Sequence, residues 1–196
     1  MLTAAALLTV ACGPPRHDID AASESTAVKT VVADKAFVSA GKITMSLDGG
    51  SYIVRAAGDN HVRVTLTGNT GNAKTEVTTG ATEATVQVND TPRNFRATID
   101  LPSAADLVVN FKGGELVMEP ITGNKTIQSY GGDIRIGVGN PDDYSRVDAT
   151  LKAGDIDASA FGGSKSGLLP HFTWSGPGKY SLRADLGAGN LVLRTK

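Results

Sequence analysis

The sequence contains a single cysteine, 5% aromatic residues and no excess of charge of either sign. One thiol cannot form an internal disulfide, so the chain has no disulfide framework. The 19 basic and 20 acidic residues leave a formal net charge of −1, and no basic stripe runs along the sequence. This balance argues against nucleic-acid binding and against electrostatic binding to an anionic membrane.

Segments typical of α-helices, rich in Ala, Leu, Glu and Lys, are also missing, whereas Val, Ile and Thr recur through the middle of the chain. The 23 glycines are spread along the sequence, which indicates many turns between short strands. The 196 residues suffice for one domain with a hydrophobic core. We therefore predict an all-β fold, with a single domain over residues 28–196.

Motifs of common catalytic and metal sites do not occur in the sequence. It has no Cys-x-x-Cys, no His-Glu-x-x-His and no Walker-type glycine loop. The three histidines, His17, His61 and His171, are far apart in the chain, which disfavours a site with two or three histidine ligands. We predict that the protein is not an enzyme and that it binds no cofactor and no metal.

The N-terminus carries an apolar run at residues 2–11, which is too short to span a bilayer. The run resembles the end of a signal peptide, and "LTVAC" resembles a bacterial lipobox, in which Cys12 becomes the first mature residue and carries lipid. No Lys or Arg precedes the run, which departs from the signal-peptide pattern. Residues 13–27 have the polar, proline-containing composition of a flexible tether.

These features divide the chain into a signal-peptide remnant (1–11), the lipidated Cys12 with its tether (12–27) and the folded domain. The predicted location is extracytoplasmic, with the membrane as a partner through the lipid anchor at Cys12. Each buried methylene of a lipid chain contributes about 0.8 kcal/mol, so the several chains of such a cysteine anchor a protein permanently.

Several short runs alternate apolar and polar residues with period two, which predicts strands at 42–47, 52–57, 61–67, 84–89 and 95–102. Near the C-terminus, "HFTW" (171–174) and "KYSLRA" (179–184) flank "SGPG". This arrangement predicts a β-hairpin, which would cap the open end of the fold.

A short motif recurs in the second half of the chain. It combines Gly-Gly or Ala-Gly, a small polar or acidic residue and two alternating apolar residues, as in "GGELVM" (113–118) and "GGDIRI" (131–136). The second glycines of the four copies are separated by 18, 22 and 35 residues; they are Gly114, Gly132, Gly154 and Gly189. Gaps near 20 residues are typical of one coil of a β-solenoid.

Glycine suits the corner of such a coil because it adopts positive φ without steric cost. The apolar residues that follow each glycine share a strand parity and are expected to stack in the core. They are Leu116, Met118, Ile134, Ile136, Ile156, Ala158, Leu191 and Leu193. We predict a single-chain β-solenoid of short strands with glycine-rich corners.

Aspartates follow two of these glycines, Gly132 and Gly154. If neighbouring coils stack in register, Asp133 and Asp155 lie in one column at successive corners, about 5 Å apart. Carboxylates placed in this way can bind Ca²⁺ or serve as the acidic pair of a polysaccharide lyase. Glu115 and Asn190 fill the equivalent positions in the other copies, so we favour turn formation on a solvated edge.

The densest aromatic group is Phe172, Trp174 and Tyr180, and the first two share a strand parity. Exposed rings of this kind stack against sugars, which makes the group a candidate ligand surface. Buried rings would instead plug the end of the coil, with 150–250 Å² of each ring removed from water. We favour the plug.

Five segments follow one another in a recognisable order: "VSAGKITMSLDGGSYIVRA", "ATIDLPSAADLVVNFKGGELVM", "GNKTIQSYGGDIRI", "GDIDASAFGGSKSGL" and "FTWSGPGKYSLRADLGAGNLVL". In this order they resemble the DUF4097 domain, an adhesin-like family of bacterial envelope proteins, over roughly residues 36–196. The resemblance implies a β-solenoid-like fold and an extracytoplasmic setting. It supplies no catalytic residues.

Three functions are consistent with these patterns. The first is a non-enzymatic envelope lipoprotein that presents a contact surface to a protein, a glycan or the cell wall. The second is an enzyme that acts on polysaccharides on a β-helix scaffold. The third is an envelope-stress or assembly accessory that binds a membrane protein. We favour the first.

The lipobox generates a direct prediction. The native protein should label with palmitate and partition into detergent, because lipid on Cys12 would be its membrane anchor. Cys12→Ser should release it into the soluble fraction. A native protein that is soluble and unlabelled would contradict the lipoprotein prediction.

Overall fold

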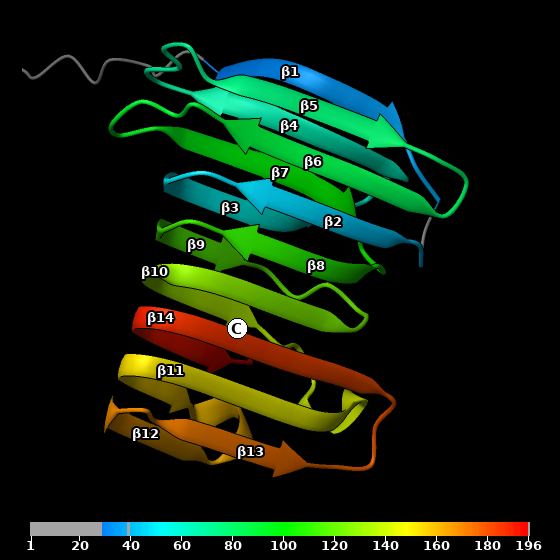
Figure 1. The fold of residues 1–196 in the computed structure, drawn as a ribbon. Helices are drawn as coiled ribbons and strands as arrows, with labels where there is room; N and C mark the ends of the chain where they lie inside the picture. The colour runs from blue at the N-terminus through cyan, green and yellow to red at the C-terminus, as the bar shows by residue number, and fades with distance from the viewer. Residues whose placement is uncertain (1–28, 39, 196) are drawn as a thin grey trace, which may run out of the picture.

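The computed structural model describes residues 29–38 and 40–195, and Figure 1 shows that they form a stack of strands. The all-β prediction is confirmed, since these residues form fourteen strands of one sheet and two helices that are single 3₁₀ turns. The predicted signal remnant (1–11) and the lipidated Cys12 with its tether (12–27) lie outside the described residues. No helix in the described part of the chain has the length and apolar character needed to cross a membrane.

In the first half of the chain the strands are β1 (Lys29–Ala36), β2 (Lys42–Leu47), β3 (Gly50–Ala57), β4 (His61–Thr67), β5 (Lys74–Thr79), β6 (Glu83–Asn89) and β7 (Arg96–Pro102). In the second half they are β8 (Asp106–Phe111), β9 (Gly114–Met118), β10 (Lys125–Gly137), β11 (Tyr144–Ala158), β12 (Gly163–Leu168), β13 (His171–Ser175) and β14 (Tyr180–Arg194). The 3₁₀ helices, η1 (Pro141–Asp143) and η2 (Ser159–Phe161), flank β11.

The sheet folds into two layers because its three longest strands, β10, β11 and β14, each take part in both. The N-terminal part of β10 (125–129) pairs with β8, and its C-terminal part (133–136) pairs with β9. One layer then continues through β2, β6 and β5, and the other through β3, β7, β4 and β1. The strands β12 and β13 both pair with β11, at the opposite end of the stack from β1 and β5 (Figure 1).

A column of glycines includes Gly132, which lies between the part of β10 that pairs with β8 and the part that pairs with β9. The four glycines of the repeated motif have φ values of 113° (Gly114), 114° (Gly132), 129° (Gly189) and 131° (Gly154). In the sheet Gly132 pairs with Gly189, which in turn pairs with Gly154. A Cβ on Gly132 would lie 2.3 Å from the carbonyl oxygen of Gly114, and one on Gly154 would lie 1.8 Å from that of Gly189. Backbones therefore approach here more closely than any side chain permits.

The core lies between the two layers and consists of side chains from alternate positions of each strand. The eight apolar residues predicted to stack behind the glycines are all buried, each at 2% exposure or less. They belong to one cluster of buried hydrophobic residues that extends from Phe37 to Leu193. Burial of these side chains removes apolar surface from water, which stabilises the fold.

The predicted C-terminal hairpin is wrong. Residues 171–175 form β13 and residues 180–194 form β14, but both strands pair with β11, the first antiparallel and the second parallel. The "SGPG" link passes over the start of β11, where the amide of Gly178 donates to the carbonyl of Tyr144 at 3.1 Å. The link is long enough to cross one strand, so its turn-forming residues connect strands that are not neighbours.

This crossing also places β14 between β10 and β11. The order of strands in space therefore differs from their order in the chain. The edge segment that remains, β12 with the residues after it, is largely exposed. Leu168 and Leu169 there are 85% and 72% exposed, and Leu169 has a φ of 50°.

The glycine column predicts a large stability difference between two Gly→Ala variants. Gly132→Ala should lower the free energy of unfolding by about 3 kcal/mol, because it adds a backbone clash to an unfavourable φ. Gly162→Ala is the matched control, since its φ is 77° but no atom lies within 4 Å of an added Cβ. It should cost only about 1 kcal/mol. Equal losses in urea unfolding would contradict the importance of the close approach.

Candidate functional site

The predicted aromatic group lies at the end of the stack where β11 and β13 pair. Phe172 is buried, and Trp174 is partly buried with its ring centre 4.9 Å from that of Phe161. Tyr180 is partly buried on β14, which follows β13 in the chain, and the Nζ of Lys179 lies 4.9 Å from its ring centre. Phe172 and Trp174 thus lie together on β13, whereas Tyr180 lies across β11 from them. The role of these rings as a plug stays a prediction.

The expectation that Asp133 and Asp155 are direct neighbours is wrong. Both pair with Asn190, because β14 lies between the strands that carry them. The Asn190 side-chain amide donates to the Asp133 carboxylate at 2.7 Å. Among residues 29–38 and 40–195, no group of three His, Cys, Asp or Glu side chains is arranged to hold a metal ion.

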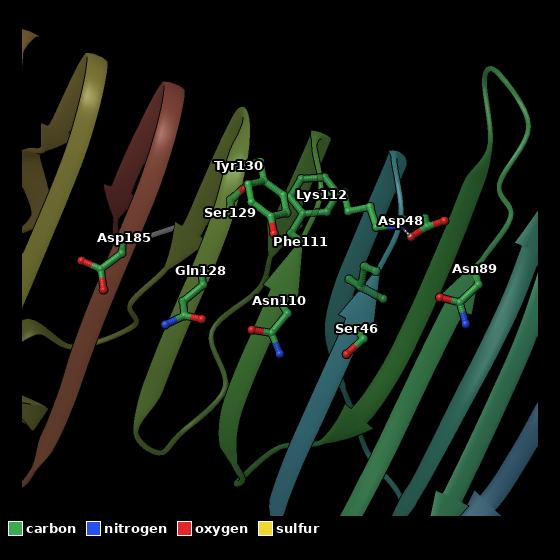
Figure 2. A pocket seen from close by; sticks show the side chains of 11 residues that line it. Ser46, Asp48, Asn89, Asn110, Phe111, Lys112, Gln128, Ser129, Tyr130 and Asp185 are labelled. Carbon is green, nitrogen blue, oxygen red and sulfur yellow. Dashed lines mark ion pairs between the residues drawn. The ribbon is translucent and has the colours of Figure 1, made fainter.

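The site that the structure does bring together is a groove on the outer face of β2, β8, β10 and β14, with a volume of about 420 Å³ (Figure 2). Its floor is a row of polar side chains paired across these four strands: Ser46, Asn110, Gln128 and Asp185. A second row, two residues further along the strands, contains Asp48, Lys112 and Tyr130, and Asn89 completes the polar lining. We call these residues the polar groove.

Tyr130 is the most prominent member of the polar groove because its side chain is 83% exposed. It follows the part of β10 that pairs with β8, directly before the Gly131–Gly132 bend. The hydroxyl of Ser129 donates to the carbonyl of Gly131 at 2.8 Å and accepts from its amide at 3.2 Å, which fixes the local turn. The backbone below the ring is therefore held in place although the ring itself is in solvent.

The charged members of the polar groove are paired within the protein. Lys112 lies 2.6 Å from a carboxylate oxygen of Asp48, and Figure 2 shows its chain reaching toward that residue. The hydrogen bond from Lys112 to Asp48 raises the pKa of the ammonium group, so it stays charged at neutral pH. Asp185 accepts from the guanidinium of Arg183 at 2.8 Å. The groove consequently presents amides, hydroxyls and one ring rather than a free charge.

A second hollow, at the other end of the stack, is lined by charged residues that include Arg55, Asp59, Arg63 and Asp100. Asp100 is 7% exposed and pairs with the guanidinium of Arg55. Asp34 receives hydrogen bonds from His61 and Arg63, which lower the pKa of its carboxyl group. These ion pairs link β1, β3, β4 and β7, so we regard the cluster as structural.

Lys125 is a buried charge that the sequence patterns did not reveal. Its side chain is 1% exposed, and its Nζ donates to the carbonyls of Ile121 (2.6 Å) and Gly123 (3.1 Å) and to the Tyr144 hydroxyl (2.8 Å). Burial lowers the pKa of this ammonium group to about 8. Since three oxygens satisfy its donors inside the core, Lys125 ties the 121–124 link to β11.

The polar groove was not predictable as a whole from the sequence, although one signal was present. In "TIQSY" the inward position of Ile127 implies, by period two, that Gln128 projects outward. The alternation identifies outward residues one strand at a time. It cannot identify the groove, because Asn110, Gln128 and Asp185 come from strands whose order in space the sequence does not specify.

No family model and no curated protein matches the sequence. Solved structures do show similarity, at low identity. A "putative cell adhesion protein" from Clostridium sporogenes is 12% identical, with 86% of this chain and 100% of that chain covered and a TM-score of 0.49. A "putative adhesin" from Bacteroides fragilis is 9% identical, with coverages of 87% and 98% and a TM-score of 0.29. A "putative adhesin" from Parabacteroides distasonis is 14% identical, with coverages of 58% and 55% and a TM-score of 0.22.

The buried ionisable groups generate a pH prediction. The pKa of Lys125 falls from 10.5 in the unfolded chain to about 8 in the folded protein, so between these values the folded state binds fewer protons. The free energy of unfolding should therefore rise by about 2 kcal/mol from pH 8 to pH 10. Above pH 10 the free energy of unfolding should fall. Burial raises the pKa values of Tyr52 and Tyr144 above 10.0, so the folded state keeps protons that the unfolded chain loses.

The Lys125→Met variant isolates the contribution of this lysine to the pH dependence of the free energy of unfolding. Urea unfolding of this variant should show no rise between pH 8 and pH 10, whereas the decline above pH 10 should remain. A variant that keeps the same rise as the wild type would show that another group causes it.

Proposed function

We propose that the protein is a non-enzymatic contact protein of the bacterial cell envelope, held at the membrane by lipid on Cys12. Its adhesin-like domain would be a β-solenoid with glycine corners that presents the polar groove to another envelope component. The partner class is a glycan, the cell wall or a protein. The lipobox-like "LTVAC" supports the anchor and the extracytoplasmic location.

The glycine column supports the solenoid part of the proposal. Three long strands pass from one layer to the other at Gly132, Gly154 and Gly189, and each follows the path of its neighbour. We expect these three long strands to be stiff, because each is hydrogen-bonded on both sides and its apolar side chains fill one core. Stiffness suits a contact surface, since little conformational entropy is lost when a partner binds.

The single observation that carries the proposal is the row of outward polar side chains, Ser46, Asn110, Gln128 and Asp185, on four adjacent strands. Backbone pairing fixes their spacing at about 4.8 Å from one strand to the next. Their amide and hydroxyl groups can donate and accept hydrogen bonds, and the Asp185 carboxylate can accept them. Such a row is a repetitive surface that matches a partner with its own regularly spaced polar groups.

The proposal is tested with the full-length chain and with isolated cell walls and membrane vesicles of its host bacterium. We expect saturable binding to one of these fractions in a sedimentation assay, and no release of reducing sugars over hours of incubation. Binding should not depend on added metal ions. Release of soluble sugars would favour the polysaccharide-acting enzyme instead, and absence of binding to every fraction would contradict the contact function.

A further inference from the structure

An exposed tyrosine on a well-ordered strand needs a physical explanation. Tyr130 is 83% exposed, whereas Tyr52 and Tyr144 are buried in the same domain. A ring left in water forgoes the stabilisation of about 1.5–3 kcal/mol that burial of a large apolar side chain provides. The fixed backbone beneath it, and the groove beside it, suggest that the ring is available for a ligand.

The surroundings of Tyr130 leave one side of its ring open. Sheet register places Gly187 of β14 opposite Tyr130, since Ser129 pairs with Leu186 and Gly131 with Ala188. A Cβ on Gly187 would lie 2.0 Å from the carbonyl oxygen of Tyr130, so the position must be glycine. Because glycine has no side chain, nothing projects from β14 beside the ring at this level. The other flank faces Lys112, which reaches away toward Asp48 (Figure 2).

The polar row lies next to this open side. Asn110 and Gln128 are exposed, and Asp185 follows on the strand that also carries Gly187. Planar amides and carboxylates form paired hydrogen bonds with adjacent hydroxyl groups. A spacing of about 4.8 Å between strands is close to the width of one sugar ring. An aromatic ring completes the arrangement, because its negative face attracts the polarised C–H groups of a pyranose.

Charge decides which carbohydrate the groove suits. The ammonium of Lys112 and the carboxylate of Asp185 are both paired, with Asp48 and Arg183 respectively. An acidic sugar would have to break the Lys112 pair to gain a partner. A neutral sugar can use the amides and the ring while both ion pairs stay intact.

We propose that the polar groove binds a neutral oligosaccharide chain laid across β8, β10 and β14. One sugar ring stacks on Tyr130 above Gly187, and hydroxyl groups bond with Asn110, Gln128 and Asp185. This inference rests on the proposed contact function and specifies the ligand class of that surface.

The test uses affinity electrophoresis and calorimetry of the full-length chain with four neutral hexasaccharides: chitohexaose, cellohexaose, laminarihexaose and mannohexaose. Hexagalacturonate serves as the acidic counterpart. We expect at least one neutral chain to bind, with a Kd that changes less than about threefold between 50 and 500 mM NaCl because no free charge takes part. Failure of all four neutral chains to bind at millimolar concentration, or tight binding of hexagalacturonate alone, overturns the proposal.

Variants then locate the site. Tyr130→Ala should weaken binding about tenfold or more, whereas Tyr130→Phe, which keeps the ring, should stay within about threefold. Gln128→Ala should weaken it by about three- to tenfold through lost hydrogen bonds. Ile53→Ala is the matched control, because Ile53 is a 44% exposed side chain on the opposite layer and should leave binding unchanged.

Measurements of stability and of envelope binding distinguish failure of the oligosaccharide inference from failure of the contact function. Tyr130→Ala should unfold at the wild-type urea midpoint, since the ring is in solvent. Unchanged oligosaccharide affinity in Tyr130→Ala would overturn the inference. If that variant also sediments with envelope fractions like the wild type, the contact function stands and another surface carries it. If the wild type binds no fraction, the contact function itself fails.

Discussion

The close approach of glycine backbones in adjacent strands is the constraint on which the rest of the structure depends. At Gly114, Gly132, Gly154 and Gly189 an added Cβ would lie between 1.8 and 2.3 Å from a neighbouring carbonyl oxygen. Only glycine fits there, because a Cβ would clash with the backbone of the neighbouring strand. The apolar residues of both layers meet in one core, where hydrophobic burial stabilises the stack.

The polar groove lies next to this column of glycines. Tyr130 stands directly before Gly131 and Gly132, where β10 leaves one layer for the other, and Gly187 stands at the matching place in β14. One glycine of this region therefore serves two purposes. Gly187 permits the backbone of β14 to lie against that of Tyr130, and it leaves the space beside the ring empty. The backbone requirement at Gly187 therefore leaves one flank of the exposed Tyr130 ring open.

The features that the sequence predicted correctly are those that depend on local patterns. The positive φ of Gly132 and the burial of Ile134 and Ile136 follow from residue type and strand parity. Features that depend on which strands are neighbours were not predictable. The insertion of β14 between β10 and β11 separates Asp133 from Asp155 and removes the expected hairpin, because turn residues such as those of "SGPG" do not specify which strands will pair. Lys125 was missed for a similar reason, since its acceptors come from a link and from β11, and nothing in the surrounding residues indicates that they converge.

The most direct test of the contact surface is hydroxyl-radical footprinting of the full-length protein, free and bound to its envelope fraction. In the free protein Tyr130 should be the most reactive tyrosine, because its side chain is 83% exposed. On binding, the account predicts strong protection of Tyr130 and no change at Leu168 and Leu169, which lie at the exposed end of the stack. Protection of Leu168 and Leu169 with an unchanged Tyr130 would contradict it and place the contact at that end.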